Sequence, residues 1–218
     1  MDLWVVALAP ILIILIYVYI RDKYEKEPWS LLLKTILAGT LITIPILFFE
    51  NVISSFCLNC QGIQLAAFQS FAVAGFTEEL FKYLALFLII RKNIHFNEQF
   101  DGIVYAVFVS LGFAAVENVL YVFQYGYTTG LIRAITAVPG HALFGVVMGF
   151  YFGKSLFNSK RKYLILALLM PILFHGFYDF ILMSENYILL LIFIPYLIYL
   201  WINGFKKMKY LSNHSRFK

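Results

Sequence analysis

The sequence predicts an all-α integral membrane protein, a polytopic bundle of about seven transmembrane helices. Of its 218 residues, 62% are hydrophobic and only 13% are charged, and the mean hydropathy is +0.82. This composition excludes a water-soluble globule, and the repeated apolar runs of about twenty residues are long enough to cross a bilayer. Residues 1–218 are expected to form a single multi-pass domain, because no linker, internal repeat or long polar insert divides them.

The charges between the apolar runs predict the orientation of the protein. The first, third and fifth loops and the C-terminal tail carry Lys and Arg, whereas the N-terminus and the other loops carry none. Basic loops stay in the cytoplasm, so the N-terminus is expected outside and the C-terminus inside. An error in the number of helices would break this alternation. The expected spans are Leu3–Ile20, Leu31–Phe49, Leu65–Ile90, Gly102–Phe123, Leu131–Gly153, Tyr163–Leu182 and Tyr187–Asn203.

Several ionisable side chains inside the spans indicate a functional site. Such groups are costly in hydrocarbon, by a few kcal/mol each even on mild insertion scales. At a rise of about 1.5 Å per residue, Glu78 lies roughly 20 Å below the outer end of its span, His141 roughly 15 Å and His175 roughly 10 Å. Helices of opposite direction therefore bring these groups into the outer half of the bilayer. The set comprises Glu78, Glu79, Lys82, Glu117 with its neighbour Asn118, His141, His175 and Asp179.

The spacing of these residues suggests how they pair. Glu78 and Lys82 are four residues apart and share a helix face, so the lysine can offset the charge of the glutamate. His175 and Asp179 have the same spacing, which suits a carboxylate that holds an imidazole. Glu79 points about 100° away from Glu78, so the two glutamates need not have the same role.

The fifth span carries a stripe of small residues beside its histidine. Glycines repeat every fourth residue after His141, and such a stripe lets another helix approach closely. Pro139 and Gly140 precede the histidine and are expected to loosen the helix there. The stripe is His141, Gly145, Gly149 and Gly153.

Two basic residues and two cysteines are expected to have no part in the chemistry. Lys34 and Arg133 lie near the ends of their spans and are expected to extend to the interface. Cys57 and Cys60 form a CxxC, which is at most half of a zinc ribbon. If their loop faces outward, a local disulfide is expected, the alternative being two free thiols.

Three interpretations fit the buried polar residues, namely hydrolysis, transport and a purely structural role. In hydrolysis, a glutamate would serve as general base while histidines orient water or donate to an oxyanion. Glutamates and two histidines can also bind Zn²⁺ with an open position, although the chain lacks an HExxH sequence. In transport, the same groups would form a proton relay, but no inverted repeat is visible. The third alternative is that each group makes only an interhelical hydrogen bond.

Four sequence motifs follow one another along the chain. They are the EExxK of Glu78–Lys82, Asp101–Tyr105 followed by Gly112-Phe113-Ala114 and Glu117-Asn118, the His141 segment, and His175–Asp179. Together they resemble the PrsW family, which is similar to the larger set of intramembrane CAAX-type endopeptidases and bacteriocin-processing proteins. The larger set has an arginine where this chain has Tyr83 and a phenylalanine where it has Ala137, and both differences favour the PrsW branch.

The resemblance implies a bacterial cell-membrane protease active in a stress response. Such a protease makes the first, site-1 cut in a single-pass anti-sigma factor on the extracytoplasmic side, and a second intramembrane protease completes the release of the sigma factor. No nucleic acid is expected as a partner. A membrane transporter or a non-catalytic relative that binds membrane proteins is the alternative.

The resemblance also implies roles for the buried residues. The expected catalytic residues are Glu78, Glu79, His175 and His141, and the expected supporting residues are Asp179, Lys82, Glu117 and Asn118. The favoured mechanism uses glutamate and water with no required cofactor. If zinc is used instead, its ligands are expected among Glu78, Glu79, His141 and His175.

Overall fold

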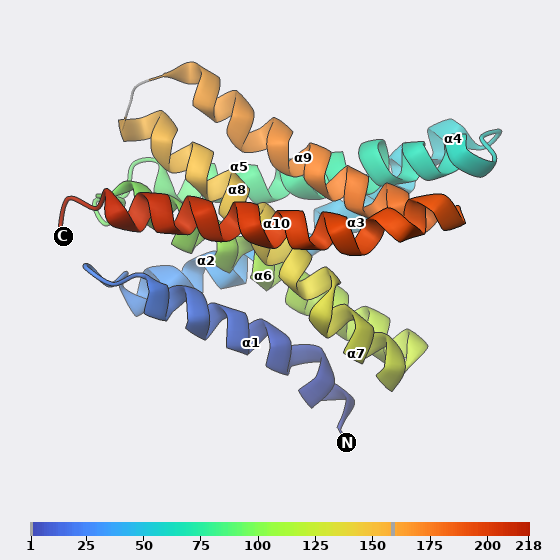
Figure 1. Ribbon diagram of the computed structural model, residues 1–218, viewed down its shortest axis with the longest axis horizontal. Coiled ribbons are helices and arrows are strands. Elements are labelled where there is room, and N and C mark those ends of the chain that lie inside the picture. Colours follow the sequence, from blue (N-terminus) through green and yellow to red (C-terminus); the bar gives the residue numbers. More distant parts are fainter. Residues whose placement is uncertain (1, 158–159) are drawn as a thin grey trace.

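The computed structural model describes residues 2–157 and 160–218, and this part of the chain is helical without strands (Figure 1). The elements are α1 (Leu3–Arg21), α2 (Trp29–Leu41), α3 (Thr43–Ser54), the 3₁₀ turn η1 (Ser55–Cys57), α4 (Gly62–Ala67), the π-helix η2 (Phe68–Gly75), α5 (Phe76–Ile90), α6 (Gln99–Tyr125), α7 (Tyr127–Ile135), α8 (Ala137–Phe157), α9 (Arg161–Met183) and α10 (Tyr187–Asn213).

Six helical segments in the described chain are long and apolar enough to cross a membrane. They confirm a polytopic membrane protein, and they contain six of the seven expected spans. The remaining expected span, Leu65–Ile90, differs because it carries three charged residues and a π-helical stretch. It is nevertheless helical throughout, since α4, η2 and α5 follow one another without a break. The N- and C-termini lie at opposite ends of the molecule (Figure 1), as an odd number of crossings requires.

The ends of several helices lie beyond the apolar runs that predicted them. The second span was expected to end at Phe49, but the helical segment continues through α3 and η1 to Cys57. The last was expected to end at Asn203, but α10 continues to Asn213, because Met208 and Leu211 of its basic end pack in the core. A hydropathy pattern marks the hydrocarbon boundary, and a helix need not stop there.

Helix α6 is the centre of the bundle. Its membrane-crossing window is 72% buried, the highest share among the six candidate spans of the described chain. The glycine stripe of α8 packs directly on it: a Cβ added at Gly149 would lie 2.2 Å from the carbonyl oxygen of Gly102. Likewise, a Cβ at Gly112 would lie 2.2 Å from the carbonyl oxygen of Ile36 in α2. The predicted small-residue stripe is therefore confirmed as a close helix crossing.

A second glycine crossing positions the start of α5 against α9. Gly75, the last residue of η2, meets Gly176 so closely that an added Cβ would lie 3.1 Å from the Gly176 backbone nitrogen. The ring of Phe71 fills the space over Gly176, where an added Cβ would lie 2.3 Å from it. Because Glu78 follows Gly75 and His175 precedes Gly176, this contact brings the glutamates and the histidine together.

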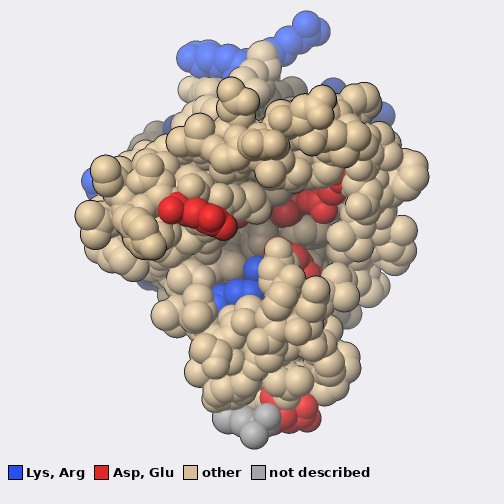
Figure 2. Space-filling view, turned by 90° about the vertical axis from the view of Figure 1, so that its right-hand side faces the viewer, with Lys and Arg blue, Asp and Glu red and all other residues tan. Residues whose placement is uncertain are grey.

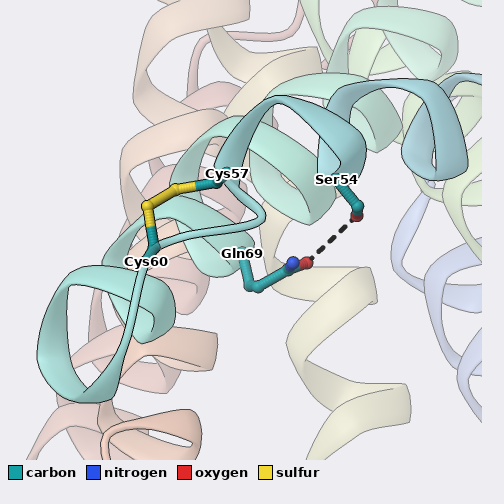
Figure 3. The surroundings of a disulfide bond; sticks show 4 residues. All are labelled: Ser54, Cys57, Cys60 and Gln69. Carbon is teal, nitrogen blue, oxygen red and sulfur yellow. Dashed lines mark hydrogen bonds between the residues drawn. A yellow bond between two sulfur atoms is a disulfide. The ribbon is translucent and has the colours of Figure 1, made fainter.

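The cysteines form the expected local disulfide near the tip of the hairpin that connects α3 to α4 (Figure 3). The bridge closes a turn between Cys57 and Cys60, and the Cys60 backbone nitrogen also donates to the Cys57 carbonyl at 3.1 Å. Ser54 of α3 donates to the side-chain oxygen of Gln69 in η2 at 3.3 Å. The disulfide thus bridges the tip of the hairpin, and this hydrogen bond links its two sides between α3 and η2 (Figure 3).

Candidate active site

Two glutamates and two histidines from three helices converge in the interior of the bundle. Glu78 and Glu79 lie in the first turn of α5, His141 lies near the start of α8, and His175 lies in α9. All four are buried, and each offers one ligand atom within 4.8 Å of the ligand atoms of the others. Residues separated by up to 97 positions in the sequence thus form one polar cluster, as their estimated depths suggested.

Lys82 lies at the centre of this cluster. Its Nζ donates to Glu78 Oε2 at 2.9 Å and to Glu79 Oε1 at 2.8 Å, and it lies 3.2 Å from Nδ1 of His141. The ammonium also sits 4.3 Å from the centroid of the Phe113 ring. The lysine side chain is fully buried, so its charge is balanced by the two carboxylates rather than by water.

His175 is held between a glutamate and an aspartate. Its Nδ1 lies 3.0 Å from Glu79 Oε1 and 3.8 Å from Glu78 Oε2, while its Nε2 lies 3.2 Å from Oδ2 of Asp179. The ring stacks on Phe144 with centroids 4.8 Å apart. The spacing of four residues therefore does place the aspartate on the imidazole, with the other ring nitrogen facing the glutamates.

His141 is held in a similar way by Glu117. Its Nε2 lies 2.8 Å from Glu117 Oε2, and its Nδ1 faces Lys82 and lies 4.0 Å from Glu78 Oε2. The carbonyl oxygen of His141 accepts a hydrogen bond from Ser110 of α6 at 2.7 Å. Each histidine thus directs Nδ1 to the centre and Nε2 to an outer carboxylate.

The interruption before His141 lies earlier than expected. We expected Pro139 and Gly140 to loosen the fifth span, but the break is at Thr136, which separates α7 from α8 with φ −119° and ψ −74°. Pro139 instead lies in the first turn of α8. Backbone N–H groups in a first turn have no partner within the helix, so the N–H that proline lacks costs no helical hydrogen bond.

The prediction that Arg133 extends to the interface is wrong. Its Nη2 donates to Glu117 Oε2 at 2.7 Å and its Nε donates to the side-chain oxygen of Asn118 at 2.7 Å. The guanidinium also stacks on Tyr121, 4.1 Å from the ring centroid. The acidic partner on α6 holds the arginine inside the protein. Lys34, by contrast, is exposed, as an interfacial lysine should be.

Asn118 does not line the cavity and supports the site only through its neighbours. Its Nδ2 donates to the carbonyl oxygen of Ala7 in α1 at 2.7 Å, and its oxygen accepts from Arg133. The asparagine therefore links α1 to the arginine that holds Glu117.

A cavity of about 650 Å³ reaches the cluster. Figure 2 looks onto the end of the molecule that carries the N-terminus, and it shows acidic and basic side chains inside a central hollow. Glu79 and Lys82 do not line this cavity and lie behind its wall. The predicted polar residues that line it are Glu78, Glu117, His141, His175 and Asp179.

Two charged residues in the cavity wall were missed by the sequence analysis. Arg133 is one, and Glu50 of α3 is the other. Glu50 lies one residue beyond the expected end of the second span, which excluded it from the buried polar set. Its isolation was an available signal, because it is the only charged residue between Lys34 and Glu78.

The donor set fits a transition-metal ion. Two carboxylates and two imidazoles are ligands that Zn²⁺ accepts, and each histidine has the outer carboxylate partner that metal-binding histidines usually have. Glu79 Oε2 is buried without a hydrogen-bond partner among the described residues. The ammonium of Lys82, which contacts three of these four residues, opposes a second cation at this position.

The fold and the site are those of a polytopic membrane protein with a buried glutamate–histidine centre, a combination that can catalyse hydrolysis. Residues 27–202 match the family described as PrsW family intramembrane metalloproteases. The chain belongs to this family, and it is a multi-pass bacterial membrane protease that works in a lipid bilayer on a protein substrate.

Curated relatives cover nearly the whole chain. It is 38% identical to Protease PrsW of Clostridioides difficile (strain 630), over 99% of this chain and 94% of that protein. It is 39% identical to Protease PrsW of Bacillus subtilis (strain 168), over 93% of this chain and 92% of that protein. No solved structure matches the chain.

Proposed function

We propose that this protease makes the first, extracytoplasmic cut in a single-pass anti-sigma factor, with Glu78 as the general base. The observation that carries the choice of base is the difference in exposure between the two glutamates. Glu78 lines the cavity and its side chain is 7% exposed, whereas Glu79 is fully buried behind it. A general base must reach the water that it activates, and of the two glutamates on α5 only Glu78 meets that condition.

Glu79 and Lys82 support the base. The ammonium bonds to both carboxylates, so it fixes their relative position and balances part of their charge. Glu79 in turn bonds to His175 at 3.0 Å, which connects the glutamate pair to the histidine on α9. In this proposal Glu79 shares the proton that Glu78 removes from water.

The histidines position the water and stabilise the oxyanion. Asp179 and Glu117 each hold one ring nitrogen, which leaves the opposite nitrogen of each imidazole directed at the centre. In the proposal, the N–H at Nδ1 of His175 donates to the developing oxyanion, and a donor fixed in this way needs no reorganisation during the reaction. Nδ1 of His141 faces the Lys82 ammonium, which only donates, so this nitrogen is an acceptor and His141 positions the water. His175 has the larger role in the proposal, because it contacts both glutamates.

A zinc ion would be held by Glu78, Glu79, His141 and His175. When bound, it would supply Lewis-acid activation of water or of the peptide carbonyl. The outer carboxylates of Asp179 and Glu117 would orient the two histidine ligands. We expect purified protein to contain about one zinc per chain and to lose activity with a chelator. Full activity of metal-free protein would instead support the mechanism that uses glutamate and water alone.

The walls of the cavity suit an extended substrate segment. A peptide bond in a helix is shielded by its own hydrogen bonds, so the substrate must unwind before it is cut, and its free backbone groups then need partners. Polar side chains of α3, η2 and α6 line the cavity and offer such partners, namely Asn51, Ser54, Gln69 and Gln124.

Co-expression with candidate single-pass anti-sigma factors tests the proposed substrate class. We expect a shortened, membrane-bound product with the wild-type protease and none with Glu78→Gln. Glu185→Gln is the matched control, because Glu185 is an exposed glutamate in the loop between α9 and α10. If none of the anti-sigma factors is shortened while another single-pass protein is, the substrate class is wrong and the protease assignment stands.

A further inference from the structure

A second group of acidic side chains is buried at the opposite end of the molecule from the cavity mouth. It lies where the loop between α1 and α2 meets the start of α6, on the side that the basic loops assign to the cytoplasm. Asp22, Glu27, Glu98 and Asp101 are each at most 4% exposed. None of them belongs to the cavity or to the proposed mechanism.

The neighbours of these carboxylates satisfy only some of their oxygens. Asp101 Oδ2 accepts from the backbone nitrogens of Asn97 and Glu98 at 2.8 and 2.7 Å. The Tyr105 hydroxyl donates to Glu27, and the side-chain amide of Asn97 donates to Glu25 at 2.9 Å. Ser215 of the C-terminal tail donates to Glu98.

Other oxygens in the same group have no hydrogen-bond partner. Eight buried side-chain oxygens in the described chain lack one, and five of these eight belong to this group or to its neighbours Glu25 and Asn97. They are both carboxylate oxygens of Asp22, Oδ1 of Asp101, Oε2 of Glu25 and Oδ1 of Asn97. Asp22 is only 1% exposed, so solvent does not solvate its carboxylate, and the Lys26 ammonium and the backbone of Glu27 compensate it only in part. Buried polar atoms are rarely left in this condition unless an ion or water satisfies them.

The charges nearby are too few to balance the group. The ammonium of Lys26 bonds to the backbone carbonyls of Tyr19 and Asp22, and it acts on the Asp22 carboxylate. Arg216 acts on Glu98. Two cations thus act on this group of acidic side chains.

We propose that this group binds a divalent cation that prefers oxygen ligands, through Asp22, Asp101 and the side-chain oxygen of Asn97. Carboxylate and amide oxygens are the ligands of Mg²⁺ and Ca²⁺, and the unpartnered atoms are all of this type. In the proposal, water completes the shell of the ion, as is usual for Mg²⁺.

The bound ion would join the first cytoplasmic loop to the start of α6. Asp22 ends α1, and Asp101 lies in the first turn of α6, the helix that also carries Glu117. Ion binding at this position stabilises the packing of α1 on the central helix without contact with the catalytic residues.

The test measures Mn²⁺ binding and thermal unfolding of the full chain in detergent. Mn²⁺ serves as a paramagnetic probe, and wild-type protein should bind one more Mn²⁺ per chain than Asp22→Asn. Mg²⁺ or Ca²⁺ should raise the melting temperature of the wild type by roughly 5–10 °C at about a hundred times Kd. The ion that acts at the lower concentration is the one that the site prefers. Glu185→Gln is the control and should behave as the wild type does.

The clearest result is the order of stability of the wild type and the Asp22→Asn variant, with and without divalent ions. Without divalent ions, Asp22→Asn should be more stable than the wild type, because it removes an uncompensated buried charge. With saturating ion the order should reverse. Asp101→Asn repeats the test and keeps an oxygen for the backbone hydrogen bonds. Equal Mn²⁺ binding by the wild type and both variants, or an order of stability that divalent ions do not change, would overturn the proposal.

Discussion

Lys82 determines the electrostatics of the candidate active site. It is the single cation among four potential metal ligands, and it contacts three of them. Its removal would leave two buried carboxylates without a counter-charge. A buried carboxylate without a partner is far less stable than one that is paired, so the lysine is needed for folding as well as for the position of the base.

Substitution of this lysine by methionine therefore has a predictable cost. Lys82→Met should lower the free energy of unfolding by about 3–5 kcal/mol, the usual consequence of breaking a buried ion pair. Lys34→Met is the matched control, because Lys34 is exposed on α2, and it should change stability little. Chemical denaturation in detergent measures both values. Equal stability of the two variants would show that the glutamate pair does not need the lysine.

The sequence predicted the residues of the site better than their partners. Spacing of four residues identified the Glu78–Lys82 and His175–Asp179 pairs, because both partners lie on one helix. Contacts between helices depend on how each helix is rotated, which hydropathy does not define. For that reason the partners of Arg133 were not predicted. Glu50 of the cavity wall was missed for another reason, because the second span was expected to end at Phe49.

At the scale of elements, the crossing of α6 and α8 sets the position of His141. Gly149 lies two turns beyond the histidine on α8 and touches the backbone of α6. The two helices can approach this closely only because no side chain lies between them. The glycine stripe was predicted from the sequence, since a period of four places its members on one face of the helix.

A matched pair of alanine substitutions tests this crossing. Gly149→Ala would place a methyl group 2.2 Å from the Gly102 carbonyl oxygen, whereas at Gly140 the nearest atom would be 3.6 Å away. Gly149→Ala should therefore separate the helices, displace His141 and remove most protease activity. Gly140→Ala should be tolerated and should gain about 0.8–1.0 kcal/mol of helix propensity. Cleavage assays and melting temperatures compare the two, and equal activity would contradict the role of the crossing.

The π-helix η2 was not predicted. Nothing in its sequence distinguishes it from an ordinary apolar helix, and its wider turn depends on packing against α9. Phe71 lies over Gly176, and Gly75 contacts the same glycine at the point where the π-helix ends. π-Helical turns are frequent at functional sites, and here the wider turn ends immediately before α5 and its two glutamates.

At the scale of the whole molecule, the positions of the basic loops orient the cavity. The rule that basic loops are cytoplasmic places the disulfide hairpin and the cavity mouth outside. The termini at opposite ends agree with an odd number of crossings (Figure 1). The fold class was predictable because a long apolar segment that crosses a membrane has few alternatives to a helix. The ends of α3 and α10 were not predictable, because helices continue beyond the hydrocarbon.

The orientation can be tested with the two cysteines, which are the only ones in the chain. In intact cells, a reductant that cannot cross the membrane should open the Cys57–Cys60 bridge, and an impermeant maleimide should then label both residues. Cys57→Ser/Cys60→Ser protein provides the unlabelled control. Labelling that requires permeabilised cells would place the hairpin in the cytoplasm and invert the proposed topology.

The central claim is that Glu78 activates the water that hydrolyses the peptide bond. Its most direct test is the rate of cleavage of a single-pass substrate in liposomes that contain the wild type, Glu78→Gln or the Glu185→Gln control. We expect Glu78→Gln to lose about 10²–10⁴-fold in rate while its helical content is retained, and the control to cleave normally. Cleavage by folded Glu78→Gln at the wild-type rate would contradict the account.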